Sequence, residues 1–153
     1  MNANQINPLL ESTTSVLTTM AMVTITAGSP SVKKNTKPLG DVTGIIKLTG
    51  IDCNGSLSIS FSSAAILSIT ENILGEKIST IDDTVVDVVG EITNMITGSA
   101  KRIYSEQGME FELTRPAMQV GREQLIEHDV KGTTIVLPFT IDAGDFFVEI
   151  CFS

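Results

Sequence analysis

Hydrophobic side chains recur every three to four residues in three stretches of the chain, which predicts three helices. The first is expected to begin at Asn7-Pro8, because Asn caps free N–H groups and Pro fits the first helical position. The second is expected to begin at Ser62 or Ser63 and to stop at Gly75. The third is long, from about Asp82 to Gln107.

A period of two residues predicts strands on both sides of the two later helices. Val42–Leu48 and Ser56–Phe61 form a hairpin across the loop from Gly50 to Gly55, and one short strand is expected before them. Four further strands are predicted at Glu110–Thr114, Met118–Val120, Lys131–Ile141 and Asp145–Phe152. We expect one α+β domain over residues 1–153, with a largely antiparallel sheet packed with a long central helix and two shorter helices.

The long helix has two contrasting faces. Its apolar face consists of Val85, Val89, Ile92, Ile96 and Ile103. The opposite face is a polar stripe of Asp87, Glu91, Asn94 and Gly98, which fall within about 60° on a wheel of about 100° per residue. A polar helix face is ordinarily solvated, but a glycine in a helix interior costs about 1 kcal/mol relative to alanine. Gly90 and Gly98 therefore favour a docking face, and Lys101 at its border is either solvated or attracts an acidic partner.

Charge and composition exclude several classes of protein. The 153 residues carry a net charge of −8, whereas nucleic-acid binding and membrane-surface binding both need clustered positive charge. The longest apolar runs are far shorter than a membrane span, and no basic side chain precedes Lys33 to mark a signal peptide. We expect a cytoplasmic protein with no nucleic-acid or membrane partner.

The inventory of metal-ligating and nucleophilic side chains is small. The chain has one histidine, His128, and two cysteines, Cys53 and Cys151, without the spacing of a zinc site. No metal site is predicted. The cysteines are expected to be small buried hydrophobes in a reducing compartment. His128 is expected on the surface, because Glu127 and Asp129 flank it.

The sequence Gly90-Glu91-Ile92-Thr93-Asn94-Met95, followed by Gly98, resembles the G-E-x-x-N-M signature of the CheX family of chemotaxis phosphatases. The wider CheC, CheX and FliY group shares a pattern of Asp or Ser, three residues, Glu, two residues and Asn. Here the three matching residues are Asp87, Glu91 and Asn94. The chain holds one copy of E-x-x-N, as is typical of CheX, whereas CheC and FliY carry two.

The resemblance implies hydrolysis of the aspartyl phosphate of a CheY-like response regulator. An acyl phosphate already hydrolyses by itself, so the catalyst needs only to orient a water in line with phosphorus. Asn94 would orient this water, since a carboxamide both donates and accepts hydrogen bonds. Glu91 would engage the regulator's active-site lysine, while Asp87, Gly90, Gly98 and Lys101 would contact the regulator. The chain would need no cofactor of its own, because the regulator would supply Mg²⁺.

The resemblance also implies a homodimer joined through its sheets. The predicted strand Lys131–Ile141 agrees with this, because a strand with apolar groups on both faces is prone to aggregate when its edge is left unpaired. An alternative function is a non-catalytic adaptor of the same fold that binds or sequesters a response regulator. A small-molecule-binding domain has no polar constellation to support it.

Overall fold

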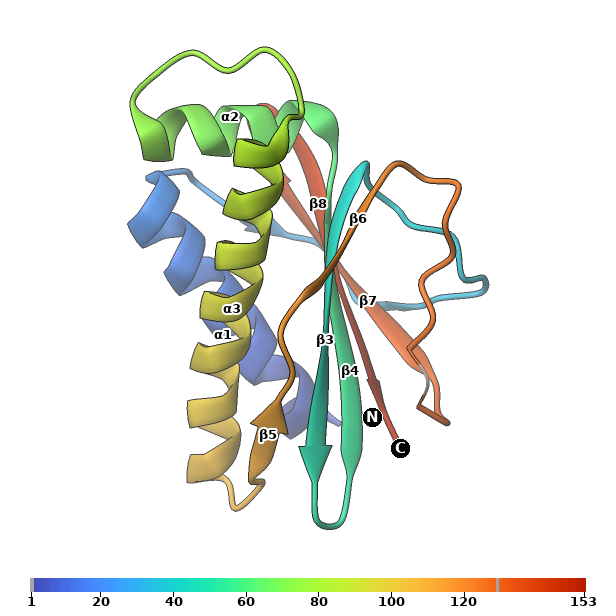
Figure 1. Cartoon of the computed structure of the whole chain (residues 1–153). Helices are drawn as coiled ribbons and strands as arrows, with labels where there is room; N and C mark the ends of the chain where they lie inside the picture. Colours follow the sequence, from blue (N-terminus) through green and yellow to red (C-terminus); the bar gives the residue numbers. More distant parts are fainter. Residues whose placement is uncertain (1, 129) are drawn as a thin grey trace.

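Three helices cover one face of a single antiparallel sheet in the computed structural model, which describes residues 2–128 and 130–153 (Figure 1). In chain order the elements are α1 (Ala3–Ala21), β1 (Thr26–Ala27), β2 (Ser31–Val32), β3 (Val42–Gly50), β4 (Asn54–Phe61), α2 (Ser63–Leu74), α3 (Asp83–Glu106), β5 (Phe111–Leu113), β6 (Ala117–Val120), β7 (Thr134–Ile141) and β8 (Gly144–Phe152). The strand order is β1-β7-β8-β4-β3-β5, with β2 also on β7 and β6 also on β3. The predicted α+β class is confirmed.

The first helix begins five residues earlier than the sequence pattern predicted. Asn2 is its cap: the Asn2 side chain accepts from the Gln5 backbone N–H at 3.2 Å, and the Gln5 side chain accepts from the Asn2 backbone N–H at 3.1 Å. This reciprocal pair satisfies two otherwise unpaired N–H groups, and it outweighs the Asn7-Pro8 signal. Pro8 lies inside α1, where its ring is buried.

The predicted limits of the two later helices are confirmed. Ser62 caps α2, and Gly75 ends it with φ of 71°, a left-handed conformation that glycine adopts at little cost. Asp82 caps α3 by accepting from the Val85 N–H at 3.1 Å. Along α3, the expected apolar side chains are fully buried except Ile103, which is half-buried; at that end of the helix Tyr104 enters the core instead.

The predicted hairpin is also confirmed, with β3 and β4 paired from Val42↔Phe61 to Thr49↔Asn54. Leu57, Ile59 and Phe61 of β4 face the helices and are fully buried. Phe146 of β8 stacks on Phe61 with ring centroids 5.2 Å apart. The hydrophobic core therefore lies between the helices and the central strands.

Strand β7 is covered at its outer edge, because two short strands of the same chain, β1 and β2, pair with it. Only one short strand was predicted in that stretch. The apolar character of Lys131–Ile141 is therefore explained within one chain, and it no longer argues for a dimer. Pairings between strands so far apart in sequence leave no local signal.

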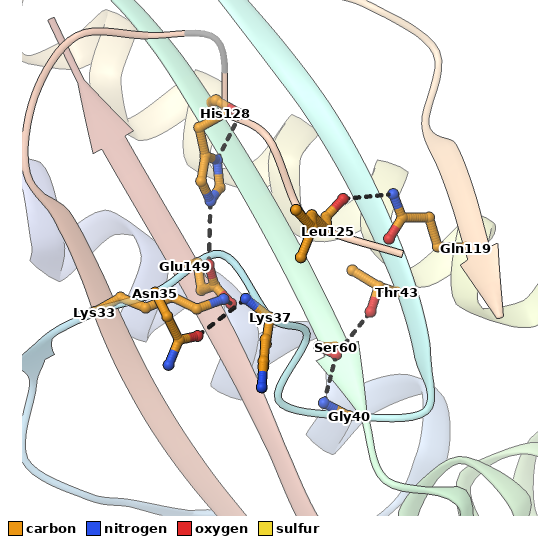
Figure 2. A network of polar contacts seen from close by, with 11 residues as sticks. Lys33, Asn35, Lys37, Gly40, Thr43, Ser60, Gln119, Leu125, His128 and Glu149 are labelled. Atoms are coloured by element: carbon orange, nitrogen blue, oxygen red, sulfur yellow. Dashed lines mark hydrogen bonds and ion pairs between the residues drawn. The ribbon is translucent and has the colours of Figure 1, made fainter. Parts of the chain in front are cut away.

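The sheet face away from the helices carries a buried polar network (Figure 2). Glu149 of β8 is fully buried and accepts a hydrogen bond from Lys33 Nζ at 2.7 Å. His128 places Nε2 3.1 Å from Glu149 Oε1 and Nδ1 2.7 Å from Ser56 Oγ. The side chain of His128 is only 9% exposed, so the prediction of an exposed surface position is wrong. Its partner Glu149 is remote in sequence, so the flanking charges were misleading.

Both cysteines are free thiols, as expected. Cys151 is buried, whereas Cys53 is only half-buried beside the turn of the β3–β4 hairpin. Burial raises the pKa of the Cys53 thiol above its ordinary value.

Candidate functional site

The predicted polar stripe lies on the outer side of α3. Asp87, Glu91, Asn94 and Gly98 are all exposed. Ile92 and Thr93, which lie between Glu91 and Asn94 in the sequence, are fully buried. The helix therefore presents Glu91 and Asn94 together on one face, three residues apart, where two side chains can reach one small target.

Neither Glu91 nor Asn94 has a side-chain hydrogen bond or ion pair with another residue of the described part of the chain. A carboxylate can accept from a cation, and a carboxamide can both donate and accept. Both groups are thus free to meet an outside partner. Met95 beside them is a large hydrophobic side chain that is 39% exposed.

The two glycines of the helix have different surroundings. A Cβ at Gly90 would lie 3.6 Å from the Met118 sulfur of β6, which is an ordinary contact. A Cβ at Gly98 would meet nothing within 4 Å. Gly90 therefore lies beside its own sheet, while Gly98 offers bare helix backbone to solvent.

Lys101 is set apart from the other predicted contact residues. It is half-buried and lines a hollow of about 350 Å³ together with Ile51 at the hairpin turn and Phe111 of β5. A smaller hollow of about 150 Å³ beside it reaches Cys53 and Gly108. Neither hollow contains Glu91 or Asn94.

An ion pair holds the turn after β6. Arg122 Nε donates to Asp41 Oδ1 at 2.8 Å, and Asp41 Oδ2 accepts from the backbone N–H and the hydroxyl of Ser63 at 2.8 Å each. The hydrogen bond from Arg122 holds the pKa of the Asp41 carboxyl below its usual value. This end of β6 is therefore tied to the start of α2.

Within residues 2–128 and 130–153, no group of three or more His, Cys, Asp and Glu side chains is arranged to hold a metal ion. No helix in the same part of the chain is both long and apolar enough to cross a membrane. What the site offers is a carboxylate and a carboxamide on a protruding helix face. This arrangement fits the class of proteins that act on the surface of another macromolecule.

Comparison with known proteins identifies the family. The sequence model of the chemotaxis phosphatase CheX matches residues 42–140. The CheY-P phosphatase CheX of Thermotoga maritima is 24% identical over 96% of this chain and 94% of that protein. The crystal structure of chemotaxis protein CheX from Vibrio vulnificus is 40% identical, covers 99% of this chain and 100% of its own, and superposes with a TM-score of 0.91. The chain belongs to the CheX family of chemotaxis phosphatases.

A further solved structure shows a family member with its partner. The CheX–CheY–BeF3–Mg²⁺ complex from Borrelia burgdorferi contains a chain 26% identical to this one, with 96% of both chains covered and a TM-score of 0.82. The resemblance inferred from the sequence around Glu91 and Asn94 is therefore confirmed at the level of the family.

Proposed function

We propose that this chain removes the phosphoryl group from the aspartyl phosphate of a CheY-like response regulator. Asn94 orients the attacking water, and Glu91 engages the active-site lysine of the regulator. The observation that carries the proposal is the exposed and unpartnered pair Glu91 and Asn94 on one face of α3, in a chain of a phosphatase family. The Borrelia burgdorferi complex supports a CheY-like partner.

The proposed reaction requires few functional groups from this chain. Phosphoryl transfer is catalysed mainly by positioning and by charge stabilisation. Mg²⁺ would be held in the acidic pocket of the regulator, and this chain contributes only the carboxamide of Asn94 and the carboxylate of Glu91. Asp87 and Gly98 lie on the same face and would contact the regulator around the inserted pair. Response regulators work in the cytoplasm, which places the protein there on this proposal.

The test is the decay of phosphorylated CheY with and without the protein. Wild type is expected to accelerate the decay, and Asn94→Ala is expected to abolish the acceleration while still binding the regulator. Asn4→Ala is the matched control, because Asn4 is an exposed asparagine on another helix. An Asn94→Ala variant with full activity contradicts the water-positioning role. Absence of acceleration by wild type, with a complex still formed, favours the non-catalytic adaptor.

We also propose that the chain forms a homodimer through its sheet. Among the described strands β6 pairs only with β3, which leaves its other edge available to a second chain, and Val120 on β6 is 55% exposed. Light scattering after size exclusion is expected to give twice the mass of one chain. A monomer at micromolar concentration contradicts the proposal.

A further inference from the structure

The helix turn that carries Glu91 and Asn94 rests on bare backbone of the sheet. Val42 and Ile46 of β3 face the helices and are fully buried, and Gly44 lies between them. A Cβ at Gly44 would lie 2.4 Å from Thr93 Oγ1 and 3.3 Å from Thr93 Cγ2. Carbon and oxygen do not approach that closely without bonding, so only glycine fits beneath Thr93.

Thr93 has little freedom to turn away. It is fully buried, and its hydroxyl donates to the Val89 carbonyl at 2.7 Å. A β-branched side chain in a helix has few permitted rotamers. An added methyl group at Gly44 would therefore press on the helix itself.

Both members of one strand pair contact the same helix turn. Gly44 of β3 is the direct register partner of Met118 of β6. Thr93 lies over Gly44, and Gly90 lies beside the Met118 sulfur. The stretch from Gly90 to Asn94 is thus seated on this pair of strands, with Glu91 and Asn94 on its outer side.

The rest of α3 is anchored on either side of this turn. Val85 and Val89 precede it and Ile96 and Tyr104 follow it, all fully buried. Because both flanks are fixed in the core, pressure from beneath Thr93 would bend the helix locally rather than lift it as a rigid rod. The bend would fall between Glu91 and Asn94.

We propose that Gly44 is a positioning residue for the phosphatase reaction, acting through Thr93 to set the relative placement of Glu91 and Asn94. This inference rests on the function proposed above. Gly44 itself is buried beneath Thr93. Its role is to leave space for Thr93, so that the turn from Gly90 to Asn94 (the motif turn) keeps regular helix geometry. A misplacement of about 1 Å can cost about 100-fold in rate.

The experiment compares Gly44→Ala with the double variant Gly44→Ala/Thr93→Ala, which removes Oγ1, the one atom of Thr93 that would lie within 3.0 Å of the added Cβ. Gly44→Ala is expected to lower kcat on phosphorylated CheY by roughly 10- to 100-fold per folded molecule. The double variant is expected to recover most of that loss. The single variant Thr93→Ala completes the cycle and gives the coupling between the two positions.

Gly55→Ala is the matched control, because its added Cβ would lie 2.7 Å from Phe152 Cε1, away from the motif turn. It is expected to lower the melting temperature while leaving kcat of the folded protein unchanged. A folded Gly44→Ala protein with wild-type kcat overturns the inference. A double variant as slow as Gly44→Ala also overturns it.

A crystal structure of Gly44→Ala tests this inference independently of the proposed phosphatase function. Relieving the contact from 2.4 Å to an ordinary 3.4 Å requires the helix to move by about 1 Å at Thr93. That displacement is expected even if wild type fails to accelerate dephosphorylation, a result that would reject the proposed function alone. An undisplaced helix rejects the positioning role.

Discussion

Replacing Gly98 by alanine should make the protein more stable and less active. A glycine in a helix interior costs about 1 kcal/mol relative to alanine, because it loses more backbone freedom on folding. The new methyl group would meet nothing within 4 Å, so no clash offsets the gain. For a domain of 153 residues, a gain of about 1 kcal/mol corresponds to a rise in Tm of about 2–4 °C.

The loss of activity follows from the regulator's approach. If the regulator packs against the bare backbone at Gly98, a methyl group there keeps the two surfaces apart. Gly90→Ala is the control for the stability change, because the helix-propensity gain is the same but the new Cβ would contact Met118 at an ordinary 3.6 Å within the chain. Thermal unfolding and dephosphorylation of CheY are measured on both variants. A stabilised Gly98→Ala protein with wild-type activity refutes the close approach, and an unstabilised one refutes the placement of Gly98 in open space.

Two further predictions concern the sheet face away from the helices and the turn after β6. Glu149→Ala should lower the free energy of unfolding by about 3–5 kcal/mol, since it leaves the buried Lys33 side chain without its carboxylate. Urea unfolding measures this change. The control is Glu106→Ala, which breaks an exposed pair with Arg102 and should change the free energy of unfolding by less than about 1 kcal/mol. Asp41→Asn should destabilise the fold at neutral pH. The hydrogen bond from Arg122 holds the folded pKa of Asp41 below its ordinary value, so the ionised carboxylate stabilises the fold above the unfolded pKa. The stability lost by the variant should therefore shrink as pH falls through the folded pKa. An undiminished difference in acid would contradict the Arg122 pair as its cause.

Features that depend on neighbouring residues were predictable from the sequence. The limits of α2 and α3 follow from Ser62, Gly75 and Asp82, which act on backbone groups within one turn. The β3–β4 hairpin follows from alternation and a short loop. The start of α1 was also a local signal, but two local signals competed, and the reciprocal bonds of Asn2 and Gln5 prevailed over Asn7-Pro8.

Features that depend on distant residues were not predictable. His128 was misplaced because its partner Glu149 comes from another element. The stripe on α3 was visible because it lies on one helix, whereas the contact between Gly44 and Thr93 joins a strand to a helix 49 positions later. The sequence marks such a glycine only as an interruption in an apolar strand.

The order of strands in the sheet also constrains how the protein is made. Strand β8 lies between β7 and β4, yet it is the last of these strands to be synthesised. Until β8 leaves the ribosome, no strand joins the β3–β4 hairpin to β7. The apolar side chains of β4 are also without their neighbours Val148 and Ile150 on β8. Strand pairing over such long sequence separations is slow, and an unpaired inner strand is prone to aggregate. The nascent chain therefore passes through a stage in which a central strand edge is open, and this is the stage at which a chaperone would be most useful.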